Sequence, residues 1–251
     1  LDTPLGNSAN LLWGADYSVN ETASPLLIND TAALDANDEV NDIDRSLDRF
    51  PAYDVDSLGL FAQGTWDISD QFQVSGGIRY EDVGLSVDDY RLAFAFSPIR
   101  EREGGNNSFD EVLFNAGLLY RPTEEIGLFA NFAQGFSIPN VGSALALVDP
   151  GFDVTADDLL LPQKVDNYEI GVRADFDQVQ ATLAGFYNES DLGSAISFDF
   201  ATNQARVERA PQRNYGVEAT LDWQPSESWR LGGLFSWNEG ENDVDYDGDF
   251  E

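Results

Sequence analysis

Cysteine, histidine and methionine are all absent from the 251 residues. Without cysteine and histidine the chain cannot build a disulfide framework, a Cys/His zinc site or a catalytic triad that uses either side chain. No isolated pair of carboxylates stands out as an acid–base couple, so the sequence predicts no catalytic residue and no enzyme. Because residue 1 is not methionine, we expect a processed or internal piece of a longer protein.

Basic side chains are scarce. The chain has 13 basic and 46 acidic residues, which gives a net charge of −33, and Lys164 is the only lysine. Such a chain repels phosphate backbones, so we expect no nucleic-acid partner. Apolar residues still make up 42% of the chain and aromatic residues 12%. That is too hydrophobic for a disordered acidic chain.

Long apolar runs are missing as well. Ala144–Val148 is among the longest, far short of the roughly 18 residues of a transmembrane helix. The first residues also lack the basic and apolar regions of a signal peptide. Neither absence excludes a transmembrane β-barrel, whose strands alternate between apolar and polar residues.

Alternation of this kind occurs along much of the chain. From Phe72 to Tyr80, apolar or small residues take every second position, and polar residues or glycine lie between them. The same pattern recurs over 168–176 and is clearest over 215–223. It predicts strands with one apolar and one polar face.

Nine such stretches can be counted, each about ten residues long or longer. They are 9–18, 57–68, 72–84, 111–121, 125–136, 165–176, 178–188, 212–223 and 228–238. A tilted strand needs about 9–11 residues to cross a membrane, whereas strands of soluble proteins usually have about 5–6. Strand length therefore favours a membrane barrel.

The connections alternate between short and long. Short links lie at 69–71, 122–124, around 177 and at 224–227, and links of about 20–40 residues lie between them. Outer-membrane barrels have short periplasmic turns and long extracellular loops. The predicted fold is therefore all-β, an antiparallel transmembrane up-and-down β-barrel.

Aromatic residues beside the short turns fit an interfacial girdle. They are Trp66, Tyr120, Phe176, Trp223 and Trp229. The alternative is a soluble β-sandwich, such as a lectin or adhesin, in which these side chains would be buried.

Several short motifs follow one another along the predicted strands. They are GLFAQ (59–63), GGIRY (76–80), GFSIPN (135–140), LPQK (161–164), YEIGVR (168–173), FYN (186–188) and NYGVE (214–218). In this order they resemble the barrel strands of TonB-dependent outer-membrane receptors, in particular the ferric siderophore receptor branch. Gln163 stands where that family usually has Glu, and Asn214-Tyr215 where Arg or Ser-x is common.

The resemblance implies a receptor in the outer membrane of a Gram-negative bacterium that transports a ferric siderophore. Its partners would be outer-membrane lipid and lipopolysaccharide, and TonB-ExbB-ExbD acting through a plug domain. We expect residues 1–251 to form one partial barrel domain that lacks the plug and the C-terminal strands. A receptor for another nutrient (cobalamin or an oligosaccharide) and a passive porin-like barrel remain open as alternatives.

Loop aromatics and arginines are the expected ligand contacts. Arginine binds carboxylate or hydroxamate oxygens, and aromatic rings stack on planar chelators. The candidates are Tyr53, Tyr90, Phe96, Arg100, Phe136, Phe152, Arg206 and Arg209. The ferric siderophore would be the transported ligand, and no covalently bound cofactor is expected.

Charges on the polar strand faces are expected to pair with one another or with the plug; they are Arg79, Glu81, Glu169, Arg173, Glu218 and Asp222.

Two acidic segments are candidate sites. Asp243, Asp245 and Asp247, followed by Gly248, reproduce the start of an EF-hand loop and allow weak Ca²⁺ binding. The glutamate that completes such a loop would fall beyond residue 251, so we favour a solvated loop and predict no metal site. The segment 18–56 carries ten acids and two arginines, and we expect a hydrated external loop with a short helix or turn over 38–44.

Overall fold

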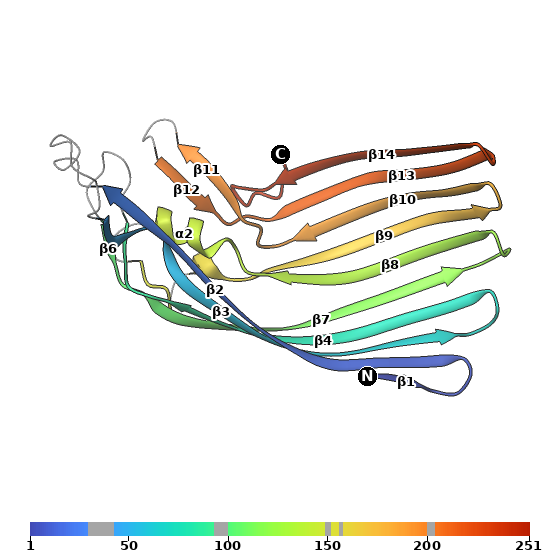
Figure 1. The fold of residues 1–251 in the computed structure, drawn as a ribbon, viewed down its shortest axis with the longest axis horizontal. Coiled ribbons are helices and arrows are strands. Elements are labelled where there is room, and N and C mark those ends of the chain that lie inside the picture. The colour runs from blue at the N-terminus through green and yellow to red at the C-terminus, as the bar shows by residue number, and fades with distance from the viewer. Residues whose placement is uncertain (30–42, 93–99, 149–151, 156–157, 200–203) are drawn as a thin grey trace.

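A curved, open antiparallel sheet of long strands dominates the computed structural model, which describes residues 1–29, 43–92, 100–148, 152–155, 158–199 and 204–251 (Figure 1). The nine long strands are β2 (Ala9–Asn29), β3 (Ile43–Asp67), β4 (Phe72–Val87), β7 (Gly105–Tyr120), β8 (Ile126–Ser137), β9 (Gln163–Phe176), β10 (Val179–Ser190), β13 (Gln212–Ser226) and β14 (Trp229–Asn242). Each pairs antiparallel with the next one along the chain. The nine predicted strands and their up-and-down order are confirmed.

Short and long connections lie at opposite ends of the sheet. The turns β3–β4, β7–β8, β9–β10 and β13–β14 meet at one end, on the right of Figure 1. The long connections meet at the other end and carry all the remaining elements except β1. We call these the turn end and the loop end.

The loop end holds several short elements. They are β5 (Tyr90–Leu92), β6 (Arg100–Arg102), the hairpin β11 (Ala195–Asp199) with β12 (Gln204–Glu208), the helix α2 (Val141–Leu147) and the 3₁₀ turn η1 (Asp158–Leu160). A three-residue strand, β1 (Asp2–Pro4), pairs with β2 at the sheet edge. Neither helical element in the described part of the chain is long and apolar enough to cross a membrane.

The prediction of a hydrated loop over 18–56 is wrong for the residues on either side of 30–42. Strand β2 continues to Asn29 and β3 already begins at Ile43, and the two pair along this extension. Register shifts occur beside Pro25, where proline cannot donate to the ladder. Pairing with a neighbouring strand thus outweighs the low strand propensity of the many acids. Most of the predicted helix or turn at 38–44 lies outside the described residues, and Ile43 and Asp44 belong to β3.

The register sorts side chains onto two different faces. Trp13, Ala62, Ile78 and Phe114 follow one another across β2, β3, β4 and β7 on the face we call outer. Ile78 and Phe114 are 47% and 49% exposed, so no described part of the chain covers the outer face at these positions. Arg79, next along β4, lies on the opposite, inner face with Asp16. The predicted alternation is therefore present in space.

Aromatic rings form a row across the outer face toward the loop end, and a stacked pair lies on the same face at the turn end. Phe132, Tyr168, Tyr187 and Tyr215 are successive cross-strand partners toward the loop end, and Tyr168 lies 5.2 Å from Phe132 and 6.3 Å from Tyr187 between ring centroids. At the turn end Phe72 stacks on Tyr120 at 4.4 Å. Tyr168 and Phe176 are separated along β9 by about 27 Å at ~3.4 Å per residue. A strand tilt of about 40° reduces this to about 20 Å, close to the apolar band of outer-membrane barrels.

Candidate functional site

A hydrophobic cluster covers the inner face at the loop end. Its wall side comes from β4, β5 and β7, and its other side comes from the connection between β8 and β9. We call the described residues of that connection, 138–148, 152–155 and 158–162, the strap. The most buried strap side chains are Val141, Ala144, Leu145, Val154 and Leu160, all at most 2% exposed.

The strap starts where β7 and β8 separate. Their ladder runs only from Tyr120↔Leu128 to Asn115↔Ala133, although both strands continue beyond it (Figure 1). Side chains replace the missing ladder bonds, because the Phe114 N–H donates to the Gln134 side chain at 3.1 Å. Lys164 spans the same gap and pairs with Glu111 at 2.9 Å.

Local sequence explains the turn into the strap. Asn140 ends the GFSIPN motif and caps α2, since its side chain accepts the Ser143 N–H at 2.9 Å. Asparagine is among the best residues at this position. The GFSIPN motif therefore has a structural role: it contains the end of β8 and the residue that caps α2.

Three wall side chains donate hydrogen bonds to strap carbonyls. They are Tyr90 to Leu145 at 3.1 Å, Arg102 to Val148 at 3.4 Å and Asn107 to Val154 at 3.0 Å. Burial raises the pKa of Tyr90 to about 12, so its hydroxyl stays a donor at neutral pH. Burying each large apolar side chain contributes about 1.5–3 kcal/mol, so releasing Val141, Leu145, Val154 and Leu160 costs about 6–12 kcal/mol. That is comparable with the stability of a whole domain, and the strap is therefore part of the folded wall.

Four predicted ligand contacts lie in or against this cluster. Tyr90 is 3% exposed and belongs to the cluster, while Tyr53, Phe136 and Phe152 pack against it as partly buried side chains. The structure brings them together by packing. Their contact with a ligand stays a prediction.

Of the three predicted arginines, only Arg209 has a side chain that the structure describes. Arg100 lies in β6 and Arg206 in β12, but their side chains are outside the description, and so is all of Phe96. The Arg209 guanidinium donates to the carbonyl oxygens of Leu161 and Leu192, and Arg209's own carbonyl accepts the Tyr246 hydroxyl. Burial lowers the pKa of Arg209 from its ordinary value. Arg209 therefore joins three loop-end segments, and a role in ligand binding stays a prediction.

The acidic turn after β14 is well ordered by its own hydrogen bonds. Asp243, Asp245 and Asp247 each offer a carboxylate oxygen, all within 4.8 Å of one another. Asp243 is 5% exposed and accepts the N–H groups of Asp247 and Gly248, each at 3.1 Å. Gly248 has φ +90°, a conformation that favours glycine. These contacts give Asp243 a structural role, and Ca²⁺ binding at the turn stays a prediction.

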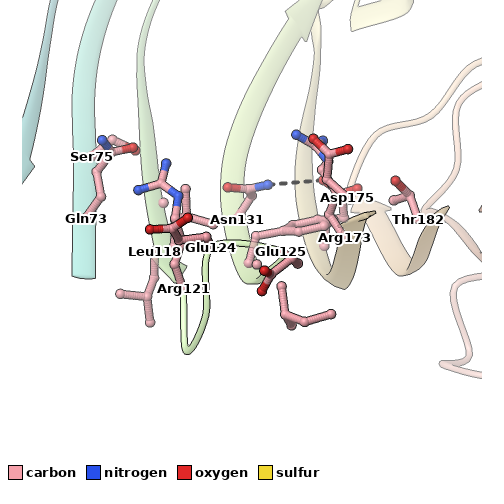
Figure 2. Close-up of a pocket in the computed structure, with 16 residues that line it drawn as sticks. Gln73, Ser75, Leu118, Arg121, Glu124, Glu125, Asn131, Arg173, Asp175 and Thr182 are labelled. Atoms are coloured by element: carbon pink, nitrogen blue, oxygen red, sulfur yellow. Dashed lines mark hydrogen bonds between the residues drawn. The ribbon is translucent and has the colours of Figure 1, made fainter. Parts of the chain in front are cut away.

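A polar hollow of about 500 Å³ lies on the inner face at the turn end (Figure 2). Its charged lining residues are Arg121, Glu124, Glu125, Glu169, Arg173 and Asp175. Asn131 donates to Glu169 at 3.2 Å within it. The hollow is the polar counterpart of the apolar cluster at the opposite end of the same face.

Arg79 is the centre of the ion pairs on the inner face. Its guanidinium makes two bonds to Asp16, at 2.8 and 2.9 Å, and a third contact to Glu81 at 2.7 Å. Gly59 leaves room for it, because a Cβ there would lie 2.0 Å from Arg79 Nη2. The predicted pairing of inner-face charges is confirmed for Arg79 with Glu81. Asp222 likewise pairs with Arg230 at 2.7 Å.

Arg79→Met is expected to lower the free energy of unfolding by about 1–2 kcal/mol, because it leaves two carboxylates side by side without a cation. Arg79→Lys should lose about half as much, since it keeps the charge but not the two-pronged contact. Urea titration of the full-length receptor in vesicles measures both. Arg230→Met is the matched control, and the exposed Arg230–Asp222 pair should contribute about 0.5 kcal/mol or less. Equal losses at the two sites would contradict the central role of Arg79.

Comparison with known proteins decides the family. The profile described as TonB dependent receptor-like, beta-barrel, matches residues 1–250. The chain belongs to this family of TonB-dependent receptors. The ferric aerobactin receptor of Klebsiella pneumoniae is 29% identical over 255 residues, which cover 93% of this chain and 34% of that receptor. The rhizobactin receptor of Rhizobium meliloti (strain 1021) is 25% identical over 206 residues, 75% of this chain and 27% of that one.

Solved structures share the fold of this receptor barrel. The copper transporter OprC superposes with a TM-score of 0.75 at 18% identity, over 95% of this chain and 36% of that one. The ferric yersiniabactin uptake receptor FyuA of Yersinia pestis gives 0.67 at 17% identity, over 99% and 35%. The receptor barrel described here thus spans about a third of the length of the relatives it matches. Its place is the outer membrane of a Gram-negative bacterium. Aromatic rings at both ends of the outer face are typical of the two membrane boundaries of such barrels.

Sequence patterns missed the strap and the loop-end aromatic row. Only seven residues of α2 are helical, too few for a helical period to stand out. The Asn140 cap was the available signal, four residues after a predicted strand. The row from Phe132 to Tyr215 could have been found by aligning the predicted strands from their short turns.

Proposed function

We propose that this chain is the barrel portion of a receptor that imports a ferric siderophore across the outer membrane, rather than an enzyme or a passive pore. One observation carries the proposal. The family match extends over residues 1–250, and the relatives aligned to most of the chain include receptors named for ferric aerobactin and rhizobactin. These names belong to the relatives, and their ligand class is transferred here as a proposal.

The geometry fits the wall of such a receptor. The outer face meets membrane lipid and lipopolysaccharide, while the inner face presents a polar hollow at the turn end and the strap at the loop end. In the full-length protein we propose that TonB-ExbB-ExbD energises uptake through a plug domain that lies against the polar inner face. The ligand would enter at the loop end, beside the strap.

Growth and uptake assays on the whole gene test the proposal. A strain deleted for the full-length gene should lose ⁵⁵Fe uptake from at least one ferric chelate under iron limitation, with ferric aerobactin and ferric rhizobactin as the first probes. The cloned gene should restore uptake, except in a strain that lacks TonB. Uptake that persists without TonB would favour the porin-like alternative. Loss of cobalamin or oligosaccharide uptake, with iron uptake unchanged, would replace the siderophore by another nutrient.

A further inference from the structure

An apolar hollow of about 530 Å³ lies on the outer face where β8, β9, β10, β13 and β14 run side by side (Figure 1). All five members of one cross-strand row line it: Ala130, Ile170, Gly185, Val217 and Trp237. Gly185 has no side chain, and a Cβ built there would have nothing nearer than the Gly216 carbonyl oxygen at 3.8 Å. The apolar row therefore has a gap at β10.

We call the space over Gly185, between the side chains of Ile170 and Val217, the slot. These two side chains lie on β9 and β13, two strand spacings apart, which is about 10 Å. One hydrocarbon chain fits between them, because packed carbon atoms lie about 3.5–4.0 Å apart. Ile170 is 69% exposed, so no described part of the chain fills the slot.

The slot lies within the apolar band of the wall. Ile170 is two positions from Tyr168 on the side of Phe176, and these two rings bound the band on β9. At the loop-end border the Tyr187 hydroxyl donates to Glu189 at 3.0 Å. The phenol oxygen therefore lies on the polar side of the border, and the ring presents an apolar surface to the slot.

We propose that the slot holds one acyl chain of a lipopolysaccharide molecule. The outer face of the receptor barrel faces the membrane, so an apolar slot within the band is filled by hydrocarbon. The slot adjoins the loop end, which is extracellular in outer-membrane barrels, and lipopolysaccharide forms the extracellular leaflet. The proposal does not depend on which nutrient the receptor transports.

Packing gives the slot its preference for an acyl chain. Lipid tails are as apolar as the wall itself, so a chain that leaves the bulk lipid gains no hydrophobic free energy. On a flat part of the wall a chain is contacted from one side. In the slot it is contacted by the backbone of β10 and by Ile170 and Val217 on either side. These contacts are individually weak and add up along the chain.

Gly185→Phe tests the proposal by filling the slot with a side chain of the receptor. The full-length receptor is purified from outer membranes in a mild detergent, and native mass spectrometry counts the lipopolysaccharide molecules that stay bound. The variant is expected to retain about one molecule fewer per barrel than the wild type, because its ring takes the place of the acyl chain.

Gly76→Phe is the matched control. Gly76 lies on the outer face of β4, two positions from Ile78, and does not line the hollow. A Cβ there would have nothing nearer than the Asn115 carbonyl oxygen at 3.6 Å, so the ring can point into the membrane. This variant should retain as many lipopolysaccharide molecules as the wild type.

A second variant removes the slot without adding bulk. Ile170→Ala combined with Val217→Ala takes away both sides of the slot and should lose the same lipopolysaccharide molecule. The folded fraction of each variant is measured by mobility on unheated gels, so the alanine pair decides the result if Gly185→Phe does not fold.

Three results would overturn the proposal. The first is an unchanged number of lipopolysaccharide molecules on the folded slot variants. The second is an equal loss from Gly76→Phe, which would show contact spread over the whole outer face. The third comes from adding phosphatidylethanolamine to the delipidated receptor: if the slot variants reduce its binding as much as that of lipopolysaccharide, the slot takes any acyl chain.

Discussion

Gly216→Ala is expected to prevent most of the receptor from reaching its folded barrel form. Gly216 lies on the inner face of β13, where a Cβ would be 2.2 Å from the Trp237 carbonyl oxygen and 2.7 Å from the Phe186 ring. The nearest obstacle is the backbone of β14, which cannot move without breaking the ladder that pairs it with β13. Overpacking usually costs about 1–3 kcal/mol, and a clash with backbone lies at the upper end of that range or above it.

The amount of folded receptor is measured by its mobility on unheated gels and by its surface level in intact cells. Gly185→Ala is the matched control, because Gly185 lies in β10, the other neighbour of β13, and its partner Val217 places it on the outer face. A Cβ at Gly185 would have nothing nearer than the Gly216 carbonyl oxygen at 3.8 Å. Both changes add one methyl group to a strand glycine. Similar folded levels for the two variants would contradict the close approach at Gly216.

Period-two alternation was sufficient to predict the wall of the barrel. Successive side chains of a strand point to opposite faces. A strand with an apolar medium on one side and water on the other therefore alternates between apolar and polar residues. Over 72–80 and 215–223 the residues of one face are apolar or small and those of the other face are mostly polar, so the alternation is sharp. The short turns then fixed the order and direction of the strands.

The loop end could not be predicted in the same way. The extensions of β2 and β3 read as acidic loop, because Asp and Glu are poor strand formers and the alternation weakens where both faces are wet. Their strand structure depends on pairing with each other, and on Tyr53 and Val55 packing against the strap from more than 80 residues further along the chain. Such non-local contacts leave no periodic signal in the sequence.

The roles of the predicted ligand contacts could not be predicted from the sequence either, because they too depend on non-local packing. An aromatic residue in a loop looks the same in sequence whether it faces a ligand or fills a core, and Tyr90 fills a core. Arg209 likewise looks like an anion-binding side chain, yet its guanidinium is engaged with the carbonyl oxygens of Leu161 and Leu192. Only the placement of the partners separates these roles, and that placement is set by the fold of the whole loop end.

Leu145→Ala is expected to lower the free energy of unfolding of the receptor by about 2–5 kcal/mol, the usual loss for a leucine truncated in a packed core. Leu145 is completely buried in the loop-end cluster, and alanine favours the helix at least as strongly as leucine. The loss therefore measures packing of the strap on the wall, not helix formation. A urea titration in vesicles gives the change, and cleavage by an external protease on intact cells shows whether the strap is released locally.

Leu147→Ala is the matched control, because it makes the same change in the same helix at a partly exposed position. It should cost about 1 kcal/mol or less and leave protease resistance unchanged. If both leucines cost the same, the apolar cluster is not what fixes the strap. If only Leu145→Ala opens the strap to protease, the apolar cluster is what takes over from the β7–β8 ladder where those strands separate. In that case the rigidity of the loop end depends on side-chain packing, in contrast to the hydrogen-bonded strands that carry the rest of the wall.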